Sequence, residues 1–295
     1  MNHSKAAIGF IGLGVMGEPM ARNMARKSGR PLIAYDLSPE PLQRLATEGV
    51  SAAPSISAIA AGAAIIFLSL PSGAQVEKVC QAGLLEGARA GQIVVDLGTS
   101  PVALTRGLAG QFAVKGAAYA DAPVARTRAA AEQGTLSIMV GAEHAIFVAI
   151  KPLLDCVATE VTHCGGVGAG QIVKILNNMV LFQTVVALSE ALAMARRAGV
   201  EGKVLFETLA KGSADSFALR NHGMKALLPG LFPKRAFGTD YALKDLGYAL
   251  DLAKSVGLDV PGAELAGALL RQASAAGLGE EYWPVFARLV DQAKK

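Results

Sequence analysis

The chain contains few of the residues that mark several classes of protein. Aromatic residues make up only 5% of its 295 positions and its lysines and arginines form no run, so the basic stripe and stacking surfaces of a nucleic-acid-binding protein are absent. Its three cysteines, Cys80, Cys156 and Cys164, are an odd number without metal-ligand spacing, as is typical of buried thiols in a reducing cytoplasm. We therefore expect a cytoplasmic protein that binds neither nucleic acid nor metal.

Long apolar runs are also missing. The longest, around Met179 to Leu188, is interrupted by Gln183 and falls short of the roughly 20 residues that cross a bilayer. The N-terminal segment leads straight into the first expected strand, without the apolar stretch and cleavage site of a secretion signal. These absences predict a protein without a membrane partner.

The chain does contain enough apolar sequence for two domains and a large core. Hydrophobic residues make up 52% of it and charged residues only 18%, so most of the chain is expected to be buried. The net charge of +4 is spread along the sequence, which indicates at most a mild preference for anionic ligands.

A glycine-rich turn, G-x-G-x-x-G, follows the first short apolar stretch. It consists of Gly12, Leu13, Gly14, Val15, Met16 and Gly17. The first glycine permits a tight turn, the second lets backbone approach a pyrophosphate, and the third lets helix pack on strand. The helix expected from about Met16 to Ser28 would point its free N–H groups at the phosphates. The turn predicts a dinucleotide site, and the alternative is a purely structural turn.

Asp36 ends the next apolar run, 19 residues after Gly17. There a carboxylate can accept hydrogen bonds from both hydroxyls of the adenine ribose. A 2′-phosphate would meet that carboxylate at close range, and residues 37–40 supply no Arg or Lys to neutralise it. NAD is therefore the expected cofactor, with NADP as the second choice. Alternatively, Asp36 caps the next helix, a position for which it competes with Ser38.

Short β-rich runs alternate with helical stretches through residues 1–165. The expected strands are Ala7 to Ile11, Pro31 to Tyr35, Ala64 to Leu70, Gln92 to Leu97, Ala118 to Ala122, Leu136 to Val140 and Val161 to His163. This alternation predicts an α/β, Rossmann-type, doubly wound and mainly parallel sheet. Ligands bind at the carboxyl edge of such a sheet, so we expect Leu70, Pro71 and Thr99 to contact the cofactor.

Residues 166–295 show no further strand pattern and predict an all-α C-terminal domain for substrate binding and dimerisation. The expected helices are Gln171 to Ala198, Gly202 to Ala210, Ser216 to Leu228, Tyr241 to Val256, Gly262 to Ala276 and Trp283 to Ala293. The first is much longer than an average helix and leaves more apolar face than a small domain can cover. We therefore expect a homodimer or homotetramer.

The first of these helices carries a polar constellation. Lys174 and Asn178 are four residues apart and Asn177 lies between them, so an ammonium and two amides share one face of an otherwise apolar helix. Their position beside the glycine-rich segment 165–170 favours a functional site. The alternative is that these side chains cap carbonyl groups at a domain junction.

The chain resembles the β-hydroxyacid dehydrogenases, the family of 3-hydroxyisobutyrate dehydrogenase and tartronate semialdehyde reductase. The resemblance covers the whole chain and rests on five ordered motifs. They are GFIGLGVMGEPMARN at 9–23, DLGT at 96–99, DAPV at 121–124, GAGQIVKILNN at 168–178 and KDL at 244–246. The resemblance implies an NAD-dependent oxidoreductase that acts on a small anionic hydroxy acid or aldehyde acid.

Carried over residue by residue, the resemblance also implies roles. Lys174 would be the catalytic acid/base, Asn178 would bind substrate beside it, and Thr99 and Lys244 would line the nicotinamide and substrate cleft. Removing or supplying a hydroxyl proton as hydride moves is a task suited to a lysine. A free lysine is mostly protonated at neutral pH, which suits aldehyde reduction. Burial and the nearby positive charge of Lys244 or Arg126 would lower the pKa of Lys174, so that it could act in both reaction directions. For Lys244 the alternative is a surface salt bridge with Asp240 or Asp245.

The substrate loop departs from the family's usual D-A-P-V-S-G-G. Here the serine and two glycines are replaced by Ala125, Arg126 and Thr127, and a guanidinium with a hydroxyl suits an anion with two or three oxygens. Within the family this form resembles sulfolactaldehyde reductases, so sulfolactaldehyde or succinic semialdehyde is the alternative substrate. In the alternatives without a functional role, Arg126 points to solvent and pairs with Glu132, and Arg128 faces solvent.

A second departure places Tyr282 where the family often has an acid, which removes an ion pair that such an acid could make to lysines of the site. Trp283, the only tryptophan, is expected to be a packing anchor.

Three rival assignments fit less well. Imine reductases and non-catalytic dinucleotide-binding modules typically lack the lysine, and 6-phosphogluconate dehydrogenase would need a much longer C-terminal region.

Overall fold

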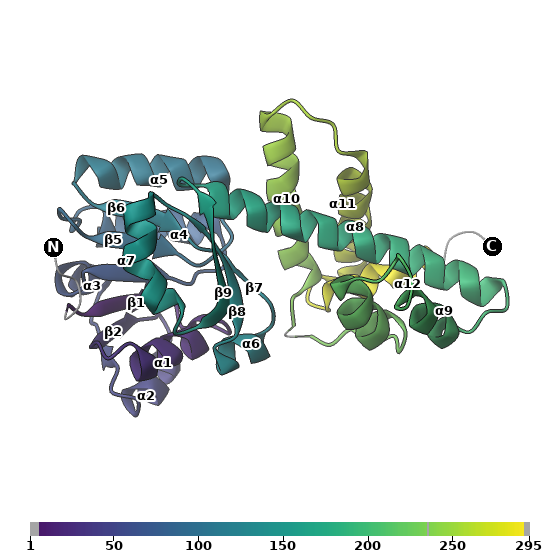
Figure 1. The fold of residues 1–295 in the computed structure, drawn as a ribbon, viewed down its shortest axis with the longest axis horizontal. Helices are drawn as coiled ribbons and strands as arrows, with labels where there is room; N and C mark the ends of the chain where they lie inside the picture. Colours follow the sequence, from purple (N-terminus) through teal and green to yellow (C-terminus); the bar gives the residue numbers. More distant parts are fainter. Residues whose placement is uncertain (1–5, 235, 292–295) are drawn as a thin grey trace. The chain divides into compact units, whose positions relative to one another are not determined.

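The computed structural model describes residues 6–234 and 236–291. The chain divides into two compact units, Met1–Lys174 and Ile175–Lys295. Helix α8 (Ala169–Arg197) begins in the first unit and continues into the second (Figure 1). The domain boundary expected at residue 165 stays a prediction.

The first unit is built on one sheet of nine strands. Along the sheet the strands run β3-β2-β1-β4-β5-β6-β8-β7, with β9 paired to β8. Their bounds are β1 Ile8–Ile11, β2 Leu32–Tyr35, β3 Ser51–Ala52, β4 Ile65–Leu68, β5 Ile93–Asp96, β6 Ala118–Asp121, β7 Val124–Ala125, β8 Leu136–Gly141 and β9 Ala158–Gly165. The order reverses between β1 and β4, which is the switch point of a doubly wound sheet.

Most strand pairs are parallel, and the two antiparallel pairs both involve β8. In β1, Ile8 lies opposite Leu32 on one side and Ile65 on the other, so that β1, β2 and β4 end at the same edge. All residues of β1, β4 and β5 are buried, as expected for central strands covered on both faces. The predicted Rossmann-type fold is confirmed.

Helices cover both faces of the sheet (Figure 1). Their bounds are α1 Gly17–Lys27, α2 Pro39–Ala46, α3 Ile56–Gly62, α4 Gly73–Val79, α5 Val102–Val114, α6 Arg128–Gln133 and α7 His144–Leu154. Side chains from α1, α2, α6 and α7 form one apolar cluster with the strand residues Phe10 and Phe67. Side chains from α3, α4 and α5 form the other with Ile11 and Leu68, because successive strand residues point to opposite faces.

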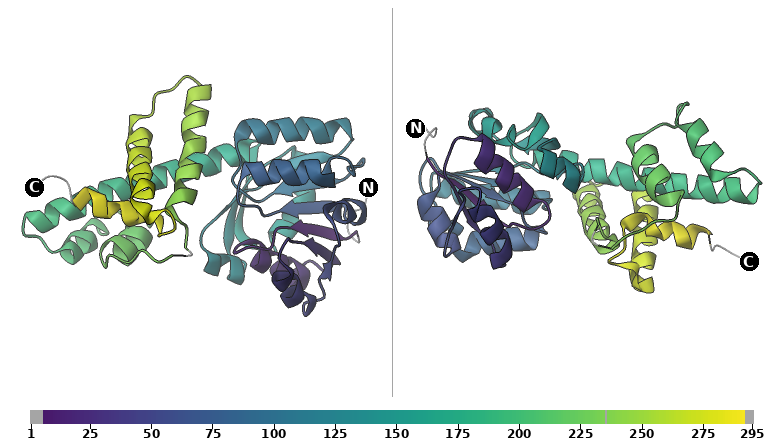
Figure 2. Two further views of the ribbon diagram at one scale, coloured as in Figure 1. Left: turned by 180° about the vertical axis from the view of Figure 1, so that it is seen from behind. Right: turned by 90° about the horizontal axis from the view of Figure 1, so that it is seen from below.

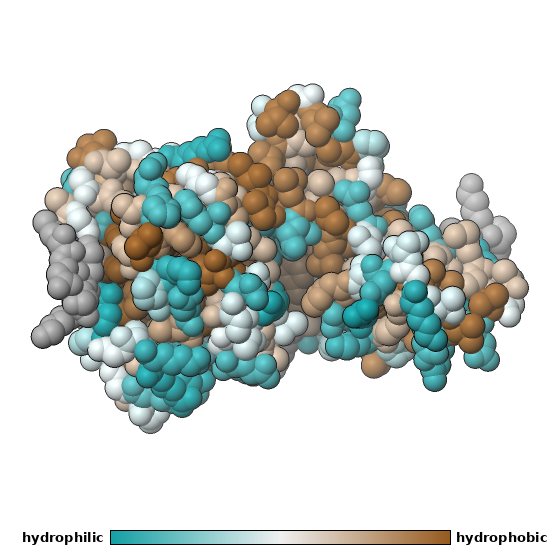
Figure 3. Space-filling view, viewed as in Figure 1, coloured by the Kyte–Doolittle hydropathy of each residue, from teal (hydrophilic) through white to brown (hydrophobic). Residues whose placement is uncertain are grey.

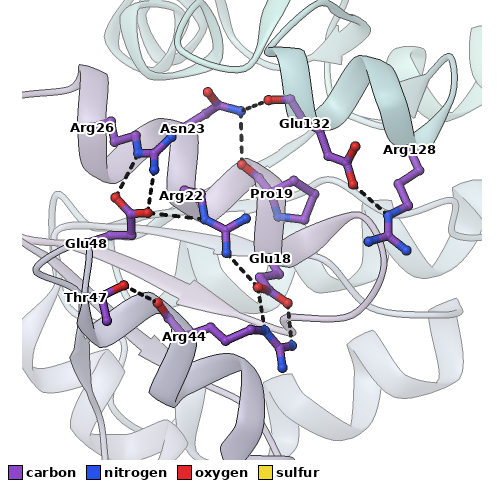
Figure 4. Close-up of polar contacts among 10 residues, drawn as sticks. All are labelled: Glu18, Pro19, Arg22, Asn23, Arg26, Arg44, Thr47, Glu48, Arg128 and Glu132. Atoms are coloured by element: carbon purple, nitrogen blue, oxygen red, sulfur yellow. Dashed lines mark hydrogen bonds and ion pairs between the residues drawn. The ribbon is translucent and has the colours of Figure 1, made fainter.

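Ion pairs join α1 to α2 and to the turn that follows it (Figure 4). Arg44 lies 2.7 Å from Glu18, and Arg26 lies 2.5 Å from Glu48. Arg22 reaches both acids, at 2.8 Å from Glu18 and 3.6 Å from Glu48. Each exposed pair alone stabilises little, but the shared acids make a network.

The second unit is helical in its described residues, as predicted (Figure 2). Beyond α8 it contains α9 Gly202–Leu209, a π-helical segment Leu219–Leu227, α10 Thr239–Ser255, α11 Pro261–Ala273, a π-helical turn Ser274–Leu278, a 3-10 turn Trp283–Phe286 and α12 Ala287–Asp291. Trp283 is fully buried and meets Phe182 of α8 edge-on at 4.8 Å between ring centres, so it is the packing anchor that was expected. The last two residues of the final expected helix, 292 and 293, lie outside the described part of the chain.

Helix α8 corrects one expectation. Sequence inspection finds its longest apolar run around 179–188, whereas the whole 29-residue helix is long and apolar enough to cross a membrane by length and composition alone. Isolated polar residues such as Gln183 do not change the average over such a length. The core helix of a soluble protein passes the same test, and α8 does place Ile175, Phe182 and Val185 in the core.

Candidate active site

The glycine turn between β1 and α1 has the geometry of a phosphate cradle. Gly12 has a φ of +93°, which a residue with a side chain rarely adopts. A Cβ at Gly17 would overlap the Gly12 carbonyl oxygen, whereas a Cβ at Gly14 would meet nothing within 4 Å. Gly14 therefore offers bare backbone to open space at the start of α1, where N–H groups and the helix dipole favour an anion.

Asp36 lies against this turn. Its Oδ2 accepts a hydrogen bond from the Leu13 backbone N–H at 2.5 Å, and its Oδ1 accepts one from the Ser38 N–H at 2.8 Å. Ser38 occupies the cap position of α2, without a side-chain cap hydrogen bond. Asp36 therefore faces the glycine turn rather than capping α2, and its remaining lone pairs suit ribose hydroxyls.

The loop after β5 is fixed from two sides. Oδ1 of the buried Asp96 accepts a hydrogen bond from Gly98 N–H at 2.8 Å, and its Oδ2 accepts one from the Ser100 hydroxyl at 2.7 Å. On the other side Gln171 accepts from Ser100 N–H at 3.0 Å and donates to the Gly98 carbonyl at 2.9 Å. These bonds flank Thr99, which is 7% exposed. Leu70 and Pro71 follow β4 on the neighbouring loop.

Gln171 was missed by sequence analysis, as was the function of Asp121. Asp121 ends β6 and accepts hydrogen bonds from the Gly168 N–H at 2.6 Å and the Gln171 N–H at 2.7 Å, so it caps the start of α8. Burial raises the pKa of Asp121 to about 6, although the backbone hydrogen bonds act in the opposite direction. One available signal was a glutamine in the first turn of an apolar helix, three residues before Lys174.

The loop that follows β7 places Arg126 in a strained conformation. Among the residues that the structure describes, Arg126 is the only non-glycine with a positive φ, at 85°. Its position matches a glycine of the usual family loop, which explains that backbone shape. Nη1 of Arg126 donates to the Thr135 carbonyl at 2.5 Å and to the Thr159 hydroxyl at 2.9 Å. A guanidinium has further N–H groups besides these.

Two alternatives for this loop are thereby decided. Glu132 pairs with Arg128 at 2.9 Å, both side chains being at least half exposed, so the suggested Arg126–Glu132 pair is wrong and the solvent-facing interpretation of Arg128 is confirmed. Arg126 is itself exposed, as that alternative expected. Arg126 belongs to a hairpin connection rather than to α6, which explains why its guanidinium reaches Thr135 instead. Thr127 is the N-cap of α6, and its hydroxyl accepts from Ala130 N–H at 3.4 Å. Ala125 ends β7 just before.

Helix α8 carries Lys174 and, one turn later, Asn178. Asn178 is 4% exposed, and its Nδ2 donates to the Asp245 carboxylate at 2.8 Å. Asn177 is exposed and donates to Oδ1 of Asn178 at 3.2 Å. Sequence analysis named the Asp245 motif but not this contact, which fixes the amide with its nitrogen toward the acid.

Lys244 precedes this acid on α10. Its Nζ lies 3.0 Å from Oδ1 of Asp245, and it lies 3.9 Å above the Tyr241 ring and 5.3 Å from the Tyr248 ring. The ion pair named as the alternative is therefore present with Asp245, although it is not the surface pair that was expected. Asp240 instead accepts from Ser274 at 2.6 Å. Lys244 is only 23% exposed, so this ion pair does not lie on an open surface. A role of Lys244 in the active site stays a proposal.

Tyr282, at the position where the family often has an acid, contacts histidine. Its hydroxyl lies 2.5 Å from Nδ1 of His222. Burial, with the nearby charge of Lys225, lowers the pKa of His222 to about 4, so the ring is neutral at physiological pH. Burial also raises the pKa of Tyr282 to about 12. This neutral pair supplies no charge to the lysines discussed above.

Comparison with known proteins agrees with this geometry. Residues 7–166 match the family model described as the NAD-binding domain of 6-phosphogluconate dehydrogenase, and residues 168–283 match that described as NAD-binding of NADP-dependent 3-hydroxyisobutyrate dehydrogenase. The chain belongs to the β-hydroxyacid dehydrogenase family. It is accordingly an NAD(P)-dependent oxidoreductase that acts on CH–OH groups of small hydroxy acids or their semialdehydes.

Three relatives show how far the similarity extends. The chain is 37% identical over 276 residues to 2-(hydroxymethyl)glutarate dehydrogenase of Eubacterium barkeri, covering 93% of this chain and 91% of the relative. It is 35% identical over 260 residues to 2-hydroxy-3-oxopropionate reductase of Escherichia coli, covering 86% of each. The solved 3-hydroxyisobutyrate dehydrogenase of Salmonella typhimurium is 29% identical, with a TM-score of 0.84 over 97% of this chain and 100% of that one.

Proposed function

We propose that this β-hydroxyacid dehydrogenase transfers hydride between NAD(H) and a small anionic 3-hydroxy acid or its semialdehyde, with Lys174 as the acid/base. The observation that carries the proposal is the face of α8. Lys174 and Asn178 lie one turn apart there, and the Asn178 amide is held by the buried Asp245. A cation and an oriented amide on one helix face can together bind the oxygen of an alcohol or aldehyde.

Nicotinamide, when bound, accepts or supplies the hydride. The chain supplies the group that transfers the proton and the groups that orient the reacting oxygen. In oxidation, the Lys174 amine takes the hydroxyl proton as hydride leaves the same carbon. In reduction, the ammonium returns that proton to the carbonyl oxygen. Asn178 orients this oxygen, with Asn177 beside it, and the family resemblance assigns Thr99 and Lys244 to the same reaction.

The residues present fit a dinucleotide. Bare backbone at Gly14, the start of α1 and the Asp36 carboxylate would hold its pyrophosphate and its adenine ribose. The carboxylate beside the turn favours an unphosphorylated ribose. We therefore propose NAD(H) as the preferred cofactor, with NADP(H) as the weaker one.

The second candidate is a reductase for an unbranched aldehyde with a sulfonate or carboxylate group, such as sulfolactaldehyde or succinic semialdehyde. Arg126 favours it because an arginine side chain stands where the usual family loop has a glycine. Such a side chain disfavours acids branched near the anionic group, such as 3-hydroxyisobutyrate. Its remaining N–H groups can bind an anion strongly.

A panel of aldehydes and hydroxy acids, assayed with NADH, NADPH and their oxidised forms, tests both candidates. Short unbranched semialdehydes should give a higher kcat/KM than 3-hydroxyisobutyrate. Arg126→Gly should raise their KM by about tenfold or more, as expected for loss of a hydrogen bond to a charged group, and leave the KM for NADH unchanged. If neither KM changes, Arg126 does not hold the substrate and an ordinary carboxylate enzyme is indicated.

We also propose that the enzyme is a cytoplasmic homodimer or homotetramer. Val180, Ala187 and Met194 recur at seven-residue spacing on α8 and are exposed, Val180 at 58% and Met194 at 66%. Apolar side chains also gather along α8 in Figure 3. A second copy of this chain would cover such a stripe by helix packing.

A further inference from the structure

Asn23, near the end of α1, joins two helices through one buried amide. The residue is 8% exposed, and its Nδ2 lies 3.1 Å from the Pro19 carbonyl oxygen of its own helix. The same nitrogen lies 2.9 Å from the Ala131 carbonyl and 3.2 Å from the Glu132 carbonyl, at the end of α6 (Figure 4). The last carbonyls of a helix have no partner within it. Asn23 therefore supplies a donor to the Glu132 carbonyl and a further donor to the Ala131 carbonyl, which also accepts from the Gly134 N–H at 3.3 Å.

Helix α6 and its flanks form a closed segment, residues 126–135. Thr127 caps the start of the helix, and Gly134, with a φ of +70°, ends it. Arg126, before the helix, donates to the carbonyl of Thr135, after it. A helix of only six residues is not stable by itself. The conformation of Arg126 therefore depends on what holds α6 in place.

An apolar side chain at position 23 would fill the same buried space but would remove the donor to the Glu132 carbonyl and leave the Ala131 carbonyl with only the Gly134 N–H, at 3.3 Å. An unsatisfied buried carbonyl is costly, so α6 would shift toward solvent. The α1 side of the contact is firm, because α1 is also tied to α2 by the ion pairs of Arg26 and Arg44. The same helix α1 begins at the glycine turn of the dinucleotide site.

We infer that Asn23, on α1, is a positioning residue: by holding α6 it fixes the positions of Arg126 and Thr127. It thereby sets the preference of the enzyme for anionic over uncharged substrates. This inference rests on the proposed function, in which residues 125–127 hold the anionic group of the substrate. Asn23 acts through the backbone of α6 and has no part in proton transfer. Its loss should therefore alter substrate selection more than the chemical step.

The test is Asn23→Asp, which keeps the shape of the side chain but turns a carboxylate oxygen toward carbonyl oxygens. The measurement is kcat/KM for succinic semialdehyde and for its uncharged methyl ester, each with NADH. We expect the ratio of the two to fall by about tenfold, the effect of one lost contact to an anion, with a KM change larger than the kcat change. The Kd for NADH should stay within about twofold, since α1 keeps its glycine turn.

Asn221→Asp is the matched control. Asn221 is half-buried in the π-helical segment Leu219–Leu227, and its amide donates to the Phe217 carbonyl and accepts from Lys225 of the same segment. This variant should keep the wild-type ratio. If Asn23→Asp also keeps that ratio, or lowers kcat/KM equally for both substrates, the inference is wrong. If the wild type itself reduces no aldehyde acid, the proposed function has failed instead.

Asn23→Ala covers the case in which the aspartate variant does not fold. It removes the donors without adding charge, so the ratio should fall in the same direction by a smaller factor. Hydrogen exchange then reports on the segment directly: amides 130–134 should exchange faster in Asn23→Ala than in the wild type, while those of α5 should not change. Unchanged exchange at 130–134 would overturn the inference.

Discussion

At the residue scale, we propose that Asp36 sets the choice of cofactor through a carboxylate that already accepts hydrogen bonds from two backbone N–H groups. Those bonds hold the acid beside the glycine turn and keep its negative charge in place. A 2′-phosphate brought there would meet like charge, whereas a ribose diol would meet an acceptor.

We expect Asp36→Ala to reduce the preference for NAD(H) over NADP(H) by about tenfold or more, which corresponds to about 1.4 kcal/mol. The substitution removes both the acceptor and the repulsion, so KM should rise for NADH and fall for NADPH. The measurement is kcat/KM for both cofactors with one aldehyde substrate. Equal turnover of the two cofactors by the wild type would contradict this assignment of Asp36.

Single residues differ in how well the sequence predicts them. Gly12 and Gly17 could be found because the local backbone requires glycine at both, and Gly14 because it completes the spacing of the glycine motif. Gln171 and Asn23 could not, since their amides bind backbone groups 71 and 108 residues away. No pattern within a helix shows which distant carbonyl a buried amide will meet. The same reason hides the contact of Asn178 with Asp245.

At the scale of elements, the start of α8 is joined to the sheet through Asp121. This buried carboxylate has a pKa raised to about 6 from an ordinary value of 3.8. The folded state therefore retains a proton on Asp121 at pH values where the unfolded state has lost it. The contribution of Asp121 to stability is greatest below about pH 4 and declines as pH rises through 6.

We expect the free energy of unfolding of the wild type to fall by about 2 kcal/mol relative to Asp121→Asn between pH 4 and pH 7, at 1.36 kcal/mol per pKa unit. Asparagine has no charge to bury, so the difference between the two proteins isolates this one group. Urea unfolding of both proteins at intervals of pH measures it. A difference that stays constant with pH would show that Asp121 keeps an ordinary pKa.

Elements with a long apolar pattern were predictable. Strands β1, β2, β4, β5 and β6 lie within the expected ranges, and so do most residues of the helices in the second unit. Strands β3 and β7 were not predicted because each has only two residues, too few to show any alternation. Strand β9 is longer than expected, since exposed polar residues at its start hide the pairing with β8.

At the scale of the whole molecule, alternation of strand and helix followed by helix alone was enough to predict the architecture. Each half supplies its own core, so the pattern of each half can be interpreted separately. The exposed stripe on α8 is the feature that one copy of the chain leaves uncovered.

We expect light scattering at micromolar concentration to give the molar mass of a dimer or tetramer. Met194→Glu changes an exposed residue near the end of α8 and should weaken assembly because it places a charge on the apolar stripe. Glu201→Gln, just beyond α8, is a control that adds no charge to the stripe. A stable monomer of about 30 kDa for the wild type would exclude the proposed assembly.

The central claim is that Lys174 transfers the proton, and its removal tests that claim most directly. Lys174→Ala should lower kcat by about two to four orders of magnitude, the usual effect of a positioned acid or base, while the Kd for NADH stays unchanged. Lys203→Ala, which removes a lysine that is 71% exposed on α9, should keep the wild-type rate. If Lys174→Ala retains more than about a tenth of the wild-type kcat, Lys174 is not the acid/base and the proposed mechanism is wrong.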